Sequence, residues 1–125
     1  MVLDLTREWE AVSGEDGGSL VTGVTICRGE LFEEHSDAVK TFMEEQKASA
    51  AFANENVAET AKLVAAAGII EKAPVAEKAI PYCSITYIDG SDMKNMLYGY
   101  LSALYEMDPT TVGGELPTKD FFYMP

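Results

Sequence analysis

The sequence predicts a small α/β domain in which most of the chain is helical and the helices pack on one or two strands. Two runs rich in β-branched and aromatic residues, 20–28 and 82–88, are typical of strands. Elsewhere apolar residues recur at helical spacing, most clearly over residues 92–106. The length of 125 residues fits a single domain, and we expect residues 1–17 to be peripheral to it.

Charge is the most distinctive feature of the composition. Nine Lys and Arg stand against 21 Asp and Glu, which gives a net charge of −12 at pH 7. Such a field repels phosphate backbones and anionic lipid headgroups, so we expect no nucleic acid and no anionic membrane surface as a partner. The chain begins without the basic and apolar regions of a signal peptide. The sequence contains no run of ~18 apolar residues, so no membrane span is predicted.

The first predicted strand follows a turn-rich break at residues 13–18. Val21 and Ile26 do not alternate cleanly with polar residues, so we expect the strand at 20–28 to be covered on both faces. Gly23 inside this run indicates a bulge, a bend or the close approach of another backbone.

Two helices are expected next, because apolar residues recur at helical spacing over residues 36–53 and again over 56–67. Asn54 or Asn56 can cap the second helix. Glu59 lies three residues after Asn56, at the position of a capping-box partner. The side chains predicted to be buried on the two helices are Val39, Phe42, Met43, Ala50, Ala53, Val57, Ala61 and Val64.

Glycine and proline mark the bounds of the later elements. Gly68 is expected to end the second helix in the left-handed conformation. Pro74 begins a short third helix and Pro81 stops it. The helix at 92–106 presents one continuous apolar face, and the aromatic cluster in the tail, 116–123, is expected to dock on a neighbouring surface. That apolar face consists of Met93, Met96, Leu97, Tyr100, Leu101 and Leu104.

The polar side chains form no catalytic or metal-binding pattern. His35 is the only histidine, and we expect it to lie in solvent at a helix start. Cys27 and Cys83 are expected to be buried free thiols, although their spacing also permits a disulfide. We therefore predict no catalytic residue, no metal and no cofactor. Several tyrosines either line a ligand pocket or, as we expect for Tyr100 and Tyr105, pack at the edge of the core: Tyr82, Tyr87, Tyr98, Tyr100 and Tyr105.

Four groups of segments, in a fixed order along the chain, carry a resemblance to a known family. They resemble the C-terminal portion of the solute-binding proteins of ABC importers, of the nitrate, sulfonate, taurine and thiamine-precursor type. His35-Ser36 departs from the His-Pro that the family usually has before the first helix. The segments are 20–28 with 32–39, then 42–49, then 79–83 with 87–90 and 93–94, and finally 113–117 with 120–123.

This resemblance implies part of a periplasmic-binding-protein-like lobe. Members of the family are much longer and have two α/β lobes, joined by crossing strands, with the ligand between the lobes. It implies a solute-binding component of an ABC-type uptake transporter, or a truncated piece of one, that recognises a small organic solute without catalysis. The implied partners are the solute, bound only with the missing lobe, and an ABC permease. The implied location is outside the cytoplasm, either membrane-anchored or periplasmic.

Two further expectations follow from the missing lobe. Thr22 and Gly23 are our candidates for ligand contact, because backbone groups of a hinge strand are available there and glycine permits a close approach; a simple bulge is the alternative. A strand at 20–28 without sheet neighbours invites pairing with another chain, so we expect a homo-oligomer or a domain-swapped dimer. The alternative function is a stand-alone dimeric α/β interaction protein built from this half-fold.

Overall fold

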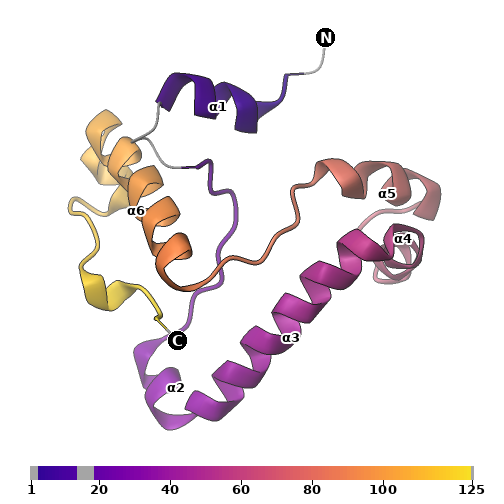
Figure 1. The fold of residues 1–125 in the computed structure, drawn as a ribbon, viewed down its shortest axis with the longest axis horizontal. Helices are drawn as coiled ribbons and strands as arrows, with labels where there is room; N and C mark the ends of the chain where they lie inside the picture. The colour runs from indigo at the N-terminus through magenta and orange to yellow at the C-terminus, as the bar shows by residue number, and fades with distance from the viewer. Residues whose placement is uncertain (1–2, 14–18, 125) are drawn as a thin grey trace. The chain divides into compact units, whose positions relative to one another are not determined.

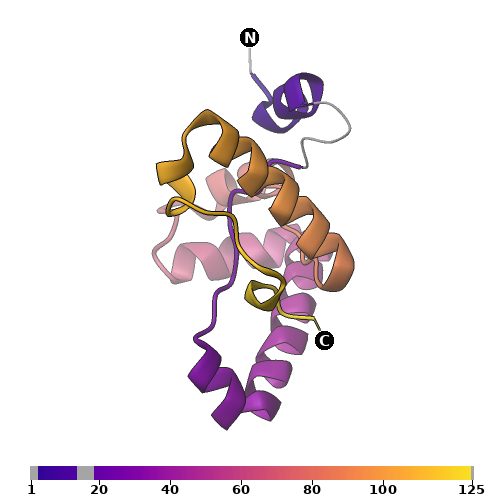
Figure 2. The same ribbon diagram turned by 90° about the vertical axis from the view of Figure 1, so that its left-hand side faces the viewer.

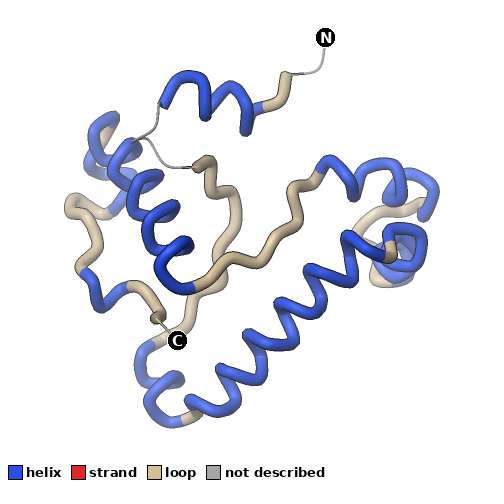
Figure 3. The backbone as a smooth tube through the Cα atoms, in the orientation of Figure 1, coloured by secondary structure: helices blue, strands red, loops and turns tan. Residues whose placement is uncertain are grey.

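The computed structural model describes residues 3–13 and 19–124, and over these ranges the chain forms helices and loops. No strand is present in the described ranges (Figure 3). The predicted α/β class is therefore wrong, and the described fold is helical. Most of the predicted break at 13–18 lies outside the described residues.

The chain divides into two compact units, which we describe separately. Unit 1 consists of residues 1–26 and 88–125, and unit 2 consists of residues 27–87. Unit 2 is thus continuous in sequence and is inserted between the two parts of unit 1. Among the helices of the described chain, none has the length and hydropathy needed to cross a bilayer.

Unit 2 is built around the long helix α3 (Ser36–Glu55), beside which the short α2 (Gly29–Glu34) lies in both views (Figures 1 and 2). The predicted helix at 36–53 is confirmed, and α2 is an addition to the prediction. Of the predicted stripe on α3, Val39, Met43, Ala50 and Ala53 are half-buried or buried, because their spacing places them on one face. Phe42, by contrast, is exposed.

The core of unit 2 lies where α4 (Val57–Ala66), α5 (Ala73–Ala79) and the 3₁₀-helix η1 (Ile80–Tyr82) meet. Ala61 and Ala76 are almost completely buried there, and small side chains allow the two helices to approach closely. Ile80 completes the buried cluster. Around it pack the partly buried side chains of Val57, Val64, Ile70 and Ile85.

The ends of α4 show one confirmed signal and one that is wrong. Gly68 has a φ of +71°, as predicted, and its N–H donates to the Ala65 carbonyl at 3.0 Å while the N–H of Ile69 donates to that of Val64 at 3.1 Å. These bonds satisfy the last carbonyls of the helix. Asn56 does occupy the N-cap position, but its side chain makes no capping hydrogen bond. The capping box is also not formed, and Glu59 instead pairs with Lys62 at 3.0 Å.

Unit 1 is built around α6 (Gly90–Met107), which confirms the helix predicted at 92–106. The predicted apolar face of α6 is half-buried along its whole length. Part of its cover comes from α1 (Leu5–Ser13), whose Trp9 ring meets the Tyr100 ring edge-on at 5.2 Å. The C-terminal tail supplies further cover and lies alongside α6 in both views (Figures 1 and 2).

A tight turn carries the chain from α6 into the tail. The 3₁₀-helix η2 (Pro109–Val112) follows α6 and is capped by Asp108. Gly113 and Gly114 then have φ values of +85° and +93°, in the region that side chains strain to enter. This pair of glycines reverses the chain, so that the last 3₁₀-helix η3 (Lys119–Phe121) and Phe122 lie against α6. The predicted docking of the tail is confirmed at Phe122, which is 6% exposed, while Phe121 remains exposed.

Neither predicted strand forms: residues 20–28 and 84–88 are loops without a strand partner, whereas Tyr82 belongs to η1 and Cys83 caps it. A β-strand exists only as part of a hydrogen-bonded ladder with a neighbour. The run at 20–28 falls mainly in unit 1, whereas 82–87 falls in unit 2. The expected cover on both faces is also wrong, since Val24 is 57% and Ile26 81% exposed. High β-propensity at 20–28 therefore accompanies an extended loop and not a strand, because a segment cannot supply its own neighbour.

Candidate functional site

The predicted contact residues lie in the extended segment 19–28 of the chain. Thr22 and Gly23 are both exposed, and a Cβ placed on Gly23 would meet no heavy atom within 4 Å. They line neither of the two cavities described below. Ligand contact by Thr22 and Gly23 stays a prediction.

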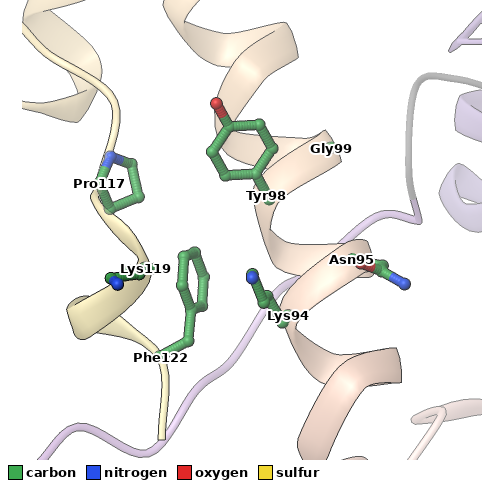
Figure 4. A pocket seen from close by; sticks show the side chains of 7 residues that line it. All are labelled: Lys94, Asn95, Tyr98, Gly99, Pro117, Lys119 and Phe122. Carbon is green, nitrogen blue, oxygen red and sulfur yellow. The ribbon is translucent and has the colours of Figure 1, made fainter.

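The larger cavity lies within unit 1, between α6 and the C-terminal tail (Figure 4). Its volume is about 500 Å³, within the usual range of ligand pockets. Its lining combines two lysines, two aromatic rings and an amide. The residues are Lys94, Asn95, Tyr98 and Gly99 from α6, and Pro117, Lys119 and Phe122 from the tail.

Helical spacing and tail docking together create this cavity. Lys94 and Tyr98 are four residues apart, so they stand one above the other on the same face of α6. Gly99 follows Tyr98 in the lining and adds no side chain to it. On the opposite wall Phe122 is buried, and its ring lies 6.4 Å from that of Tyr98 at an angle of 58°. Phe121 meets Phe122 edge-on at 5.3 Å, which fixes the orientation of the buried ring.

The charge of the lining is opposite to that of the chain. Lys94 and Lys119 are its only charged residues, in a chain whose net charge is −12. In the described structure neither ammonium group takes part in a hydrogen bond or an ion pair; the ion pairs join Arg7 to Asp4 and Lys62 to Glu59. Asp120 follows Lys119 directly but does not line the cavity. The site therefore offers a positive, partly aromatic surface to a small molecule.

A smaller cavity, of about 210 Å³, lies within unit 2 where the extended segment 85–87 runs beside α3. Asn54 holds this segment in place, because its Nδ2 donates to the Ile85 carbonyl at 2.9 Å and to the Ala50 carbonyl at 2.9 Å. Lys47 lies over the Tyr87 ring, with Nζ 5.8 Å from the ring centroid. These interactions are already satisfied within the protein, so we regard this cavity as a packing feature.

The other residues singled out from the sequence, His35, Cys27 and Cys83, do not line the larger cavity. His35 is exposed and lies between α2 and α3, as predicted. Cys27 and Cys83 are free thiols, but both are exposed, so their predicted burial is wrong. Cys27 lies in an extended loop with no covering sheet, and Cys83 caps the end of η1. Within the described ranges no three side chains of His, Cys, Asp or Glu are grouped as metal ligands.

The lysines of the larger cavity are the functional candidates that sequence reasoning missed. Tyr98 was considered as a pocket residue, and the tail was expected to dock. Polar residues flank the surface on which the tail docks. Lys94 lies one helical turn before Tyr98, and Lys119 lies three residues before Phe122. Those spacings were visible in the sequence, but the surface that received the tail was not.

Comparison with known proteins identifies no relative of the chain. No protein-family model, no curated protein and no solved structure matches the chain.

Proposed function

We propose that this chain is a solute-binding component of an ABC-type importer, or a portion of one, and that it recognises a small organic solute without catalysis. The observation that carries the proposal is an extended, exposed apolar segment at the first of the two passages between the units. The chain leaves unit 1 between Ile26 and Cys27 and returns to it between Tyr87 and Ile88. Both passages fall within extended segments.

The exposed apolar residues of the first crossing support the same proposal. Val24 and Ile26 are exposed on a segment of high β-propensity. Exposed apolar strands are normally covered or paired. A further β-rich lobe supplies the missing neighbour in this proposal, and the solute is enclosed between that lobe and this chain. The permease of the importer is the proposed protein partner, and the proposed location is outside the cytoplasm.

The native state of the polypeptide tests this proposal directly. Antibodies against the described helices are used to isolate the protein from its source cells after chemical cross-linking, and mass spectrometry identifies what is bound. We expect an ABC permease among the cross-linked proteins, and the chain in association with a β-rich lobe, covalent or separate. Recovery of a free homodimer from the cytoplasm, with no permease, would overturn the proposal in favour of a stand-alone interaction protein.

Solute binding by the isolated 125-residue chain gives a second test. Isothermal titration with nitrate, taurine and thiamine should show no tight 1:1 binding, because one wall of the proposed cleft is missing. The same titration on the assembly isolated from cells is the control, and it should show binding of at least one solute of this kind. Tight binding to the isolated chain would contradict the proposed need for a second lobe.

A further inference from the structure

We propose that the cavity between α6 and the tail binds a planar aromatic molecule that carries a carboxylate. The cavity lies wholly within unit 1, so the inference does not depend on a second lobe. Three observations carry it: the charge of the lining, the aromatic wall, and the presence of charged and aromatic side chains in one cavity.

The charge of the lining calls for an anion. Lys94 and Lys119 line one cavity, and neither has an ion pair or hydrogen bond in the described structure. An anion bound beside either ammonium group gains an electrostatic attraction that no carboxylate of the described chain supplies. Lys94 is half-buried, so its interaction with a bound anion is less screened by solvent than that of a fully exposed lysine. No lining residue carries a negative charge that would compete for the lysines.

The aromatic wall calls for a ring. Phe122 is buried and is held between Tyr98 and Phe121 by ring contacts of 6.4 and 5.3 Å. The accessible face of an aromatic ring binds another ring in an offset or edge-on arrangement, and Tyr98 offers such a face because it is 43% exposed while the buried Phe122 backs it. Pro117 adds a further rigid apolar group to the same wall. Because these groups are already ordered, a ligand ring loses little of its binding energy to ordering the site.

The two parts of the lining are placed so that one ligand can meet both. In Figure 4 the Lys94 side chain reaches from α6 toward the ring of Phe122, whereas the Asn95 amide points away from the tail. The Tyr98 hydroxyl points away from Lys94, so the ring of Tyr98, and not its polar end, faces the space near the lysine. A carboxylate near Lys94 and Lys119, with its ring against Tyr98 and Phe122, fits this arrangement.

Ligand-observed ¹⁹F NMR on the full chain tests the proposal, with 4-fluorobenzoate as the probe. The neutral 4-fluorobenzamide and the cationic 4-fluorobenzylamine have the same ring and test the charge. We expect binding of the benzoate and clearly weaker binding of the other two. Lys94→Gln and Lys119→Gln should each weaken benzoate binding by roughly 2- to 5-fold, the usual size of a partly exposed charge interaction, and the double variant by more.

A matched control separates the site from the general charge of the chain. Lys78→Gln removes one positive charge from α5 in unit 2 and should leave benzoate binding unchanged. Amide chemical shifts of labelled protein give a second readout, and the changes should be confined to residues 94–99 and 117–122. The proposal is overturned if the benzamide binds as well as the benzoate, if Lys78→Gln weakens binding equally, or if the shift changes lie elsewhere.

Discussion

At the scale of single residues, the side chain of Asp108 joins the end of α6 to the turn that begins the tail. Its Oδ1 accepts hydrogen bonds from the backbone N–H of Thr110 at 2.9 Å and from the Thr110 hydroxyl at 2.8 Å. These two bonds, the hydroxyl bond first, hold the pKa of Asp108 below its ordinary value of 3.8. The hydroxyl of Thr111 also donates to the Asp108 carbonyl at 2.8 Å. This one residue therefore organises the start of η2.

This lowered pKa predicts an acid-sensitive contribution to the stability of unit 1. A carboxyl whose pKa is lower in the folded state stabilises the fold above its unfolded pKa, and the contribution is lost as the pH falls through the folded pKa. Replacing Asp108 by Asn keeps an oxygen that accepts from Thr110 but removes the titration. We expect the melting temperature of Asp108→Asn to fall less than that of the wild type between about pH 5 and about pH 2.

The control for this experiment removes a charge of the same kind at another N-cap. Asp89 is the N-cap of α6, but its side chain makes no capping hydrogen bond. Asp89→Asn therefore reports the effect of one lost negative charge without a lost or altered cap. If Asp108→Asn and the wild type show the same fall in melting temperature, Asp108 does not stabilise the fold through its charge.

At the scale of elements, the contact between α4 and α5 depends on side chains being small. Ala76 is completely buried, and it packs with Ala61 and Ile80 in the core of unit 2. A larger side chain at this position has to push the helices apart. Ala76→Leu should lower the free energy of unfolding of unit 2 by about 1–3 kcal/mol, the usual cost of overpacking a core.

Urea denaturation, followed by circular dichroism and by the amide exchange of α4 and α5, measures this change. Ala58→Leu is the matched control, because Ala58 lies on the exposed side of α4. Exposed substitutions of this kind change stability by less than about 0.5 kcal/mol. Equal stability of Ala76→Leu and Ala58→Leu would mean that the core of unit 2 does not require a close approach of the two helices.

The helices were predictable from the sequence, but the strands and the caps were only partly so. Helical spacing indicated α3, α4 and α6, because a helix satisfies its backbone within its own segment. The extended runs needed information from outside themselves, since a strand depends on a neighbour. Caps failed for a similar reason: Asn54 was available as a cap for α4, but it bonds instead to Ile85, which is distant in sequence.

The candidate site was predictable to the same partial extent. The aromatic tail was expected to dock, and Phe122 does so on α6. The two lysines beside it could not be identified, because residues 94 and 119 come together only after the Gly113-Gly114 turn has reversed the chain. Local patterns thus predicted the helix α6 and the docked tail, but not that Lys94 and Lys119 would line one cavity between them.

At the scale of the whole molecule, the exposed crossing segment predicts self-association of the isolated chain. Ile26 is 81% exposed on an extended segment that has no neighbouring strand in the described fold. Such a segment can pair with another chain. We expect light scattering to report an oligomer whose share rises with concentration, and Ile26→Lys should shift the equilibrium toward the monomer.

Ile69→Lys is the control for this prediction. Ile69 is 74% exposed, but it lies in the turn after α4 and not on the crossing segment. The substitution adds the same charge and removes the same side chain, so it should leave the oligomer unchanged. A clean monomer at high concentration, or an equal effect of the two variants, would show that the crossing segment does not drive association.

The insertion of unit 2 into unit 1 also bears on the order in which the molecule is made. Residues 27–87 leave the ribosome as one block, and all the contacts within unit 2 are available as soon as Tyr87 has emerged. Unit 1 has to wait for α6 and the tail, which follow several seconds later at ~5–20 residues per second. During that interval α1 has no Tyr100 to pack against. Nascent chains are therefore expected to carry a folded unit 2 beside an unfinished N-terminal segment, which is the state that a chaperone would meet first.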